Sequence, residues 1–509
     1  MRNKKFIYIS AICFASLVFP QSCSKSFLEQ KNTSGITEDA LFKKPEDGIA
    51  LVTGIYNTFH DVDFMLKALW YQANFLTQDF QNYGADVFFK TYEVPTDFGA
   101  LNTFWTRAYQ GIARANSAFP IIEKMRSANI ISEDLAKRLT GEAYFLRGVL
   151  YYYLASNFGG VPLELKTVTD DGRHPRNTQD EVFAAVAEDM KKAADLLPWK
   201  EDLAPADLGR ANKGAALAYL GDAQMWLKKY SDAVQSYKQL QGHFQLEPKF
   251  IDIHDFNNQN GKESIFEVQF IAGADMSWNH TNNNHWLASF GMPEEITQFG
   301  YAYATADLYN SFEPGDQRKA ATVIGPGDTH PDPKCQISKY PRVISNFGGI
   351  NTCGTKANPW KGSDKARSGY YGVKTWRDPN VTGNTGDIYI FSGQNVIMMR
   401  YGQVLLSLAE ALHKSGNDGE AIDIINNQIR HRAGLGPVSG TNVMNSLLDE
   451  YRHELAGEMS LWYMLRRSGE HLRFVKEKYG ITVPAGKDLM PIPQIQIGLN
   501  QQLTQNPGY

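Results

Sequence analysis

Apolar residues recur at helical spacing along much of this 509-residue chain, most clearly over Gly209–Leu240. There they fall three and four residues apart, which places them on one face of a helix. The order of small and large residues along this stretch is that of a tetratricopeptide repeat, which consists of two antiparallel helices. In such a repeat the small side chains let the two helices approach closely, and the large ones fill the groove between them. The matching positions are Leu217, Leu220, Gly221, Tyr230, Ala233 and Tyr237.

A second stretch, residues 403–429, fits the same frame and has Gly416 and Gly419 in its turn. Two matches in one chain favour a helical-repeat scaffold, and two unrelated helical hairpins are the alternative. The matching positions here are Leu405, Leu408, Ala409, Ala421 and Ile425.

Further helices are predicted before these repeats. The apolar spacing is helical over 104–125 and over 141–160, and paired glycines end the second stretch. Thr178 with Glu181 three residues later is a capping box, which opens another helix. This helix and 141–160 together predict a hairpin with a long loop. Such hairpins bury their apolar faces only against neighbours, so we expect them to stack into one scaffold.

Two segments differ from the helical stretches in composition and in hydrophobic periodicity. Residues 61–101 and 271–395 are rich in Gly, Asn, Pro and aromatic residues and show little periodicity. The run ESIFEVQF, residues 263–270, is typical of a strand at the edge of the second segment. Loop-rich segments of this length are uncommon in compact domains and are where ligand contacts usually lie. We therefore expect a mainly α fold in which a loop-rich, partly irregular insertion lobe packs across the helical scaffold.

The start of the chain has the pattern of a secretory signal. Three basic residues precede an apolar run over 6–19. This run is shorter than the roughly 20 residues that a membrane-spanning helix needs. Ser22 is small, as is required before a lipidated cysteine, so Cys23 is predicted to be the lipid anchor of the mature chain. The alternative is an ordinary secreted protein.

The charge of the chain limits its possible partners, and its few cysteines limit its possible disulfides. The formal net charge is -4 and no long block of like charge occurs, which argues against nucleic acid as a partner. After Cys23 the remaining cysteines are Cys335 and Cys353. In an exported protein they either close a disulfide or remain two free thiols, and the sequence leaves both open.

Motifs in a consistent order from Cys23 to Tyr509 resemble the SusD/RagB family of Bacteroidetes outer-membrane lipoproteins. Their order along the chain is the exported cysteine, GIARAN, GEAYFLRGVLYYYLASNFGGVPL, GRANKGAALAYLGDA, ESIFEVQF, MMRYGQVLLSLAEAL, RHRAGL, RHELAGEMSLWYMLRR and LMPIPQIQIGLNQQLTQNPGY.

The resemblance implies a tetratricopeptide-like, SusD-like fold. It also implies a lipid anchor in the outer leaflet of the outer membrane, facing the cell exterior. Members act as lids on a SusC-like TonB-dependent transporter that imports oligosaccharides or, in some cases, peptides. The implied organisation is a signal peptide, 1–22, and a single SusD-like domain, 23–509, with the scaffold mainly in 102–245 and 396–475 and the ligand lobe mainly in 61–101 and 271–395.

A sugar presents an apolar ring face and a rim of hydroxyls, so its receptor needs aromatic planes and Asn, Asp, Gln or Arg side chains. Residue type and segment select candidates in two loops, and for each ring the alternative is packing on the scaffold. The candidates are Asp79, Asn82, Tyr83 and Tyr92 in the first loop and Trp278, Asn282, Asn283 and Trp286 in the second. Trp360, Tyr370, Tyr371 and Trp376 form a third aromatic cluster.

Enzyme signatures are sparse. His280 and His285 lack the spacing and the nearby third ligand of a zinc site. RHELAGE, residues 452–458, lacks the second histidine of a zincin motif. We therefore expect a non-catalytic, glycan-binding receptor without metal or cofactor. A peptide receptor, a protein-interaction repeat with no small ligand, and an exported glycosidase with paired carboxylates are the alternatives.

Overall fold

The computed structural model describes residues 41–82, 86–271, 292–297, 302–349, 368–376, 378, 392–438, 440 and 442–509. The predicted signal peptide, 1–22, and the predicted lipidation site, Cys23, lie outside these residues, and both stay predictions.

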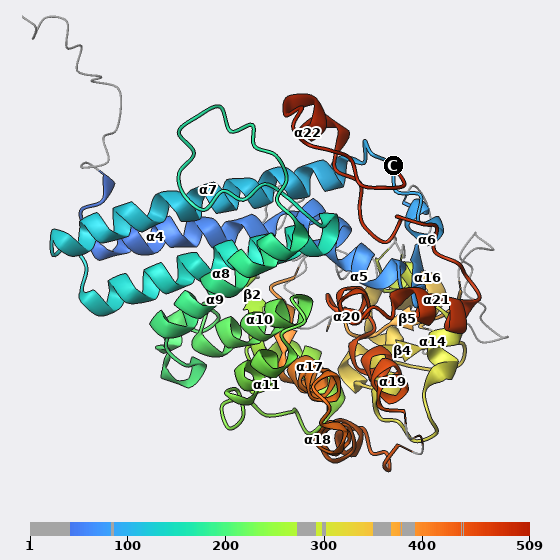
Figure 1. The fold of residues 1–509 in the computed structure, drawn as a ribbon. Helices are drawn as coiled ribbons and strands as arrows, with labels where there is room; N and C mark the ends of the chain where they lie inside the picture. The colour runs from blue at the N-terminus through green and yellow to red at the C-terminus, as the bar shows by residue number, and fades with distance from the viewer. Residues whose placement is uncertain are drawn as a thin grey trace, which may run out of the picture.

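The architecture is mainly α, as the apolar spacing predicts, and its long helices stack side by side (Figure 1). Each helix of the stack packs against the next one along the chain. The stack consists of α4 (Pro45–Tyr56), α7 (Gly99–Ser127), α8 (Glu133–Phe158), α9 (Gln179–Leu196), α10 (Lys213–Trp226), α11 (Tyr230–Lys238), α17 (Tyr401–Lys414) and α18 (Asp418–Ile424).

The predicted hairpins are present in this stack. The α10–α11 and α17–α18 pairs coincide with the two tetratricopeptide-like stretches, and α8 packs along α9. The capping box at Thr178 is confirmed: its backbone N–H donates to the Glu181 carboxylate at 2.7 Å, while its hydroxyl accepts from the Glu181 backbone N–H. This reciprocal pair satisfies donors that the first turn of α9 would otherwise leave free.

Helices near the two ends of the chain complete the scaffold. In the first part of the chain they are the 3₁₀ turn η1 (Asn57–His60), the π-helix η2 (Asp63–Trp70), α5 (Tyr71–Phe75) and α6 (Phe88–Thr91). After α18 they are the π-helical turn η9 (Ile425–Arg430), α19 (Val443–Leu455), α20 (Leu461–Ser468), α21 (His471–Tyr479) and α22 (Gln494–Leu499). None of the helices in the described part of the chain has both the length and the apolar character that crossing a bilayer requires.

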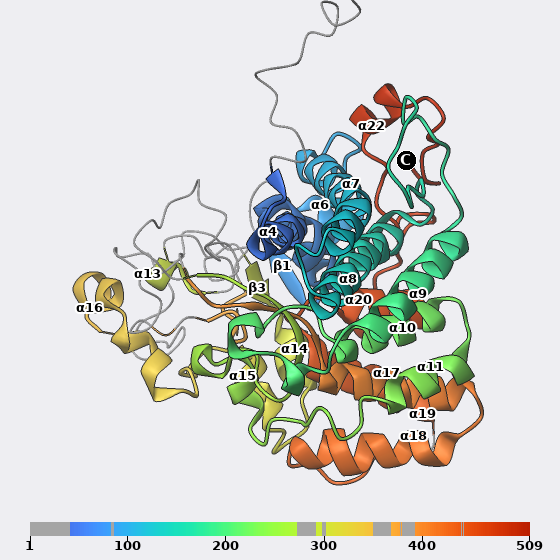
Figure 2. The ribbon, with the colours of Figure 1, turned by 90° about the vertical axis from the view of Figure 1, so that its left-hand side faces the viewer.

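A two-stranded neck leads into and out of the lobe. The strand predicted from ESIFEVQF is confirmed as β2 (Ser264–Val268), which is buried along its whole length and pairs antiparallel with β6 (Val396–Arg400). Figure 2 shows the lobe on one side of the helix stack. The 3₁₀ turn η5 (Phe250–His254) precedes β2. The described elements of the lobe are α13 (Glu294–Thr297), β3 (Ala302–Ala304), α14 (Ala306–Ser311), α15 (Arg318–Thr322), β4 (Val323–Ile324), η7 (Pro333–Cys335), η8 (Ile337–Lys339), α16 (Pro341–Phe347) and β5 (Tyr371–Gly372).

Close contact between α10 and α11 depends on Gly221. A Cβ atom at this position would lie 2.4 Å from Cε1 of Tyr237. The Tyr237 ring has no room to move, because it is buried and its hydroxyl donates to Asp222 at 2.5 Å. The small-against-large pairing that the sequence predicts at these two positions is therefore a direct contact.

We expect Gly221→Ala to lower the free energy of unfolding by about 1–3 kcal/mol, since overpacking against Tyr237 outweighs the roughly 1 kcal/mol gain in helix propensity. Gly54→Ala in α4 is the matched control, because a Cβ atom there meets nothing within 4 Å. It should raise stability by about 0.5–1 kcal/mol. Urea unfolding measures both, and stabilisation by both substitutions would contradict the packing argument.

Candidate functional site

The structure joins the first candidate loop to the insertion lobe through short strands. The strand β1 (Phe80–Asn82) pairs antiparallel with β3, so Asn82 lies opposite Ala302. Ala304 in turn bridges to Tyr370, and β5 pairs with β4. Four segments far apart in the sequence thus form one patch of paired backbone, which we call the lobe sheet.

Of the first-loop candidates that the structure describes, Asn82 keeps some exposed surface in this patch. Residue 83 follows it directly, and residue 301 directly precedes its partner Ala302. Paired strands lie about 4.8 Å apart, so the lobe sheet places the backbones of Asn82 and Ala302 side by side. The candidates Tyr83, Trp278, Asn282, Asn283 and Trp286, and Trp360 of the third cluster, lie outside the described residues and stay predictions.

Asp79 is a packing residue and has no exposed surface, which corrects its expected role as a direct ligand contact. Its carboxylate accepts hydrogen bonds from Nε of Arg452 at 2.8 Å and from the Tyr479 hydroxyl at 2.5 Å. Its backbone carbonyl accepts from the Thr305 N–H at 2.9 Å. Asp79 therefore fixes the lobe sheet to α19 and to the end of α21.

Tyr92 is also buried, with 1% of its surface exposed, so the alternative of packing on the scaffold holds for this ring. Its hydroxyl donates to the Leu76 carbonyl at 2.7 Å, and its ring lies against Trp462. Burial raises the pKa of Tyr92 well above its usual value. Residue type alone does not distinguish an aromatic ring that is exposed to a ligand from one that is packed in the core.

The third aromatic cluster contributes to a small core inside the lobe. Tyr371 and Trp376 are buried there with apolar residues from α13, η8 and α16. Tyr370 is half-buried, and its ring lies 5.0 Å from that of Tyr309. The lobe thus has an apolar core of its own, which keeps its described strands in place.

A cavity of about 340 Å³ lies where the lobe meets η5. Trp376 and His330 line it, with ring centroids 5.1 Å apart, and Asp252 and Lys374 are among its polar walls. Burial lowers the pKa of His330 to about 4, so its ring is neutral at pH 7. Its Nδ1 accepts a hydrogen bond from the Asp332 backbone N–H at 3.1 Å, which fits a neutral imidazole.

We expect stability to fall between pH 6.5 and pH 4, because the unfolded chain takes up a proton at His330 near pH 6.5 while the folded ring stays neutral down to its pKa of about 4. The loss at pH 5 should be about 2 kcal/mol. His330→Gln cannot titrate, so its change in unfolding free energy between pH 7 and pH 5 should be smaller by that amount. Equal pH dependence in the two proteins would contradict the neutral burial of His330.

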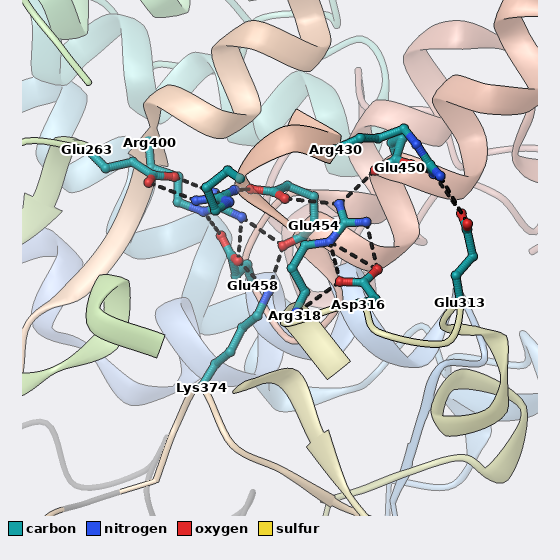
Figure 3. A network of polar contacts seen from close by, with 11 residues as sticks. Glu263, Glu313, Asp316, Arg318, Lys374, Arg400, Arg430, Glu450, Glu454 and Glu458 are labelled. Carbon is teal, nitrogen blue, oxygen red and sulfur yellow. Dashed lines mark hydrogen bonds and ion pairs between the residues drawn. The ribbon is translucent and has the colours of Figure 1, made fainter. Parts of the chain in front are cut away.

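A network of buried charged side chains ties the lobe to the scaffold (Figure 3). Arg400, at the end of β6, lies at its centre: Nη1 is 2.7 Å from carboxylate oxygens of both Glu263 and Glu454, and Nε is 2.6 Å from Glu458. None of these four side chains is more than 6% exposed. The arrangement pairs charges of both signs that have almost no contact with solvent.

The lobe contributes two cations to this network. Arg318 of α15 contacts Asp316 at 2.8 Å and Glu450 at 2.7 Å, and Lys374, just after β5, contacts Glu458 at 2.5 Å. The acidic partners Glu450 and Glu458 lie on or just after α19. Two separate segments of the lobe are therefore bonded to α19 and to the turn that follows it.

The charge balance keeps the acidic side chains ionised. Burial raises the pKa of Glu454, but the nearby charges of Arg432, Arg400 and Arg318 outweigh burial and hold it well below its usual range. A close approach of the chain makes room for this cluster, because a Cβ atom at Gly402 would lie 2.5 Å from Nη1 of Arg400.

Sequence reasoning missed the role of these acidic residues. Glu450, Glu454 and Glu458 are spaced by four, a pattern typical of one helix face, although α19 ends at Leu455 and Glu458 lies just after it. That spacing was a usable signal for a charged stripe, but a charged stripe is normally exposed. RHELAGE, which fails as a zinc motif, supplies the last two of these network anchors.

No cluster of three or more His, Cys, Asp and Glu side chains in the described residues is arranged to hold a metal ion. Cys335 is buried in the lobe core and forms no disulfide with another described residue, and burial raises the pKa of its thiol well above the usual range. Its predicted partner, Cys353, lies outside the described residues, so their pairing stays a prediction.

Comparison with known families agrees with the resemblance. The model described as "SusD family" matches residues 241–509, more than half of the chain. The chain belongs to the SusD family. A second model, described as "Starch-binding associating with outer membrane", matches residues 26–225.

Relatives of the SusD family cover the whole chain. SusD-like protein P2 of Formosa agariphila is 25% identical over 95% of this chain and 96% of its own length. SusD-like protein P38 of the same organism is 25% identical over 100% of both chains. A SusD-like protein of Bacteroides ovatus is 23% identical over 89% of this chain and 80% of its own.

Solved structures show that the fold is that of SusD. A laminarin binding SusD-like protein matches with a TM-score of 0.73 and 21% identity, over 92% of this chain and all of its own. A SusD homolog from Bacteroides thetaiotaomicron matches with a TM-score of 0.74 and 20% identity, over 93% and 98%. A structure described with xylogluco-oligosaccharide matches with a TM-score of 0.71 and 19% identity, over 89% and 97%.

Proposed function

We propose that this protein is a non-catalytic, glycan-binding lipoprotein of the outer membrane, anchored through Cys23 and facing the cell exterior. It captures an oligosaccharide or polysaccharide and delivers it to a SusC-like TonB-dependent transporter. The observation that carries the proposal is the likeness, over most of the chain, to a laminarin binding SusD-like protein and to a structure described with xylogluco-oligosaccharide.

The arrangement of the lobe supports this function. The lobe sheet pairs the chain just before Tyr83 with the chain that follows the second candidate loop. The buried charge network and the Asp79–Arg452 pair bond that sheet to α19 and to the turn that follows it. A binding surface on rigid supports loses little conformational entropy when a ligand binds.

The test is a screen of residues 24–509 against laminarin, xyloglucan, starch and other polysaccharides, and against short peptides, by affinity electrophoresis and calorimetry. At least one glycan should bind, and Trp278→Ala with Trp286→Ala should weaken that binding. Trp199→Ala is the control, since this ring stacks on His243 in the scaffold. Binding of peptides alone would overturn the glycan assignment.

The non-catalytic part is tested by incubating the bound glycan with the protein and separating the products by chromatography. We expect the chain-length distribution to stay unchanged. Hydrolysis that a single carboxylate substitution abolishes would overturn it.

Anchoring and delivery need tests in cells. Cys23→Ala should release the protein from the membrane fraction, whereas Cys335→Ala should leave it membrane-bound. The wild-type protein should co-purify with a SusC-like transporter. If Cys23→Ala stays membrane-bound as Cys335→Ala does, the lipid anchor is contradicted. If the wild-type protein is isolated without a transporter, delivery to a SusC-like partner is contradicted.

A further inference from the structure

A hollow of about 580 Å³ lies on the scaffold, outside the lobe sheet. Its floor includes Phe244 and Tyr401, two mostly buried rings whose centroids are 6.3 Å apart. Its rim comes from the loop after α11, from η9 and from the residue before α15. In Figure 2, α15 and α17, which adjoin or contribute its lining residues, lie below β1 and β3.

Uncommitted amide side chains surround this hollow. Among the contacts of the described residues, the side chains of these amides make no hydrogen bond to the protein. They are Gln245, Gln317, Asn427 and Gln428. The larger hollow between α7 and α22, about 690 Å³, differs, because Asn116, Gln496 and Asn500 in its walls donate to protein oxygens. The amides of the smaller hollow are available to a ligand.

The Tyr401 hydroxyl adds a polar group at the floor of this hollow. The side chain is 6% exposed, and within the described structure its hydroxyl has no hydrogen-bond partner, although the oxygen is not sealed from the surface. A mostly buried tyrosine hydroxyl normally has a partner. Since Tyr401 lines this hollow, a ligand seated there can supply that partner.

Rigid elements hold the amides in place. Asn427 and Gln428 stand on η9, a π-helical turn, and such turns are frequent at functional sites. The Gln317 backbone N–H donates to the Ala433 carbonyl at 3.0 Å, which ties the lobe residue to the end of this helix.

The charges of the hollow are already compensated. Arg432 is paired with Glu263 and Glu454 in the buried network, and Glu247 lies 3.9 Å from Lys262. An ionic ligand would therefore find no free opposite charge on these residues. Several amides that both donate and accept, with one hydroxyl, suit a neutral ligand rich in hydroxyl groups.

We propose that this hollow is a second carbohydrate-binding site, which holds a short neutral oligosaccharide independently of the lobe. The inference rests on the proposed function for the class of ligand that reaches the protein. Two sites on one chain raise the apparent affinity for a polymer that engages both, or that links neighbouring molecules.

The experiment uses the polysaccharide that the wild-type screen identifies and a short oligosaccharide of it. Calorimetry of residues 24–509 should give about two oligosaccharides per chain, and Asn427→Ala with Gln428→Ala should reduce this to one. The same variant should weaken retention of the polymer in affinity gels by about 10-fold. Tyr401→Phe, which removes only the hydroxyl, should weaken retention by a smaller factor.

Gln501→Ala is the matched control, because it removes an exposed amide near α22, at the opposite end of the molecule from α18 (Figure 1). It should change neither the stoichiometry nor the retention. Wild-type stoichiometry and retention in the Asn427→Ala, Gln428→Ala variant would overturn the second site and leave the proposed function standing. Binding of no glycan by the wild-type chain would overturn both. A thermal unfolding scan confirms that each variant is folded.

Discussion

Replacement of Arg400 by methionine is expected to lower the free energy of unfolding by about 3–5 kcal/mol. The substitution keeps a long apolar stem but removes a guanidinium group that contacts three buried carboxylates. Those carboxylates then remain in a dry environment with fewer cations, which is more costly than losing the attraction itself. Urea unfolding at pH 7 measures the loss.

The elements that lose protection from hydrogen exchange test the argument as directly as the loss of stability does. Arg400 joins β6 to the scaffold beneath the lobe, so hydrogen exchange in β4 and β5 should become faster in Arg400→Met. Arg126→Met is the control, since Arg126 pairs with Glu123 and Glu133 on the surface, where side chains are 40–60% exposed. It should cost less than about 1 kcal/mol. Equal effects of the two substitutions would contradict the network argument.

The difference in unfolding free energy between the wild-type protein and Arg400→Met should be smaller at acidic pH. The pKa of Glu458 is held well below its usual range, because the charges of Arg400 and Lys374 outweigh burial. A depressed pKa contributes stability that is present above the unfolded value of about 4.5 and is lost as pH falls toward the folded value. The gap measured at pH 7 should therefore be smaller at pH 3.

Arg467→Met is expected to have a comparable effect, about 3–5 kcal/mol, in a different part of the molecule. Arg467 of α20 contacts Asp222 of α10 and Glu410 of α17, each at 2.7 Å, and all three side chains are 1% exposed. Tyr451 donates to the same Glu410 at 2.6 Å. Losing the cation leaves two buried carboxylates on two stacked helices without their shared partner.

Hydrogen exchange should separate the two substitutions. Arg467→Met should accelerate exchange in α10 and α17 more than in the lobe strands, the reverse of Arg400→Met. Lys478→Met is its control, because Lys478 pairs with Asp449 at the surface, with the two side chains 32% and 52% exposed. A loss of several kcal/mol in Lys478→Met would show that exposure is a poor guide in this protein.

Local patterns predict the scaffold well because each signal acts over a few residues. The contact of Gly221 with Tyr237, the capping box at Thr178 and the strand in ESIFEVQF all depend on nearby spacing, and the structure has all of them. The SusD family is likewise recognisable from motifs that lie in order along the chain.

The site is predicted less well, because exposure is not a local property. Asp79 and Tyr92 have the residue types of a sugar site, yet both are buried by partners far along the chain, Arg452 and Trp462. The amides around the hollow at Phe244 and Tyr401 come from three separate segments, and no spacing in the sequence brings them together.

The sequence by itself therefore determined the helical repeats, their caps and the neck strand, since hydrophobic periodicity and capping chemistry operate within a few turns. Only the tertiary structure decided which polar residues are buried partners and which stay exposed. Glu454 shows the reason: a carboxylate in a helical stripe reads as exposed, and it becomes a core residue only because Arg318, Arg400 and Arg432 arrive from distant segments to compensate its charge.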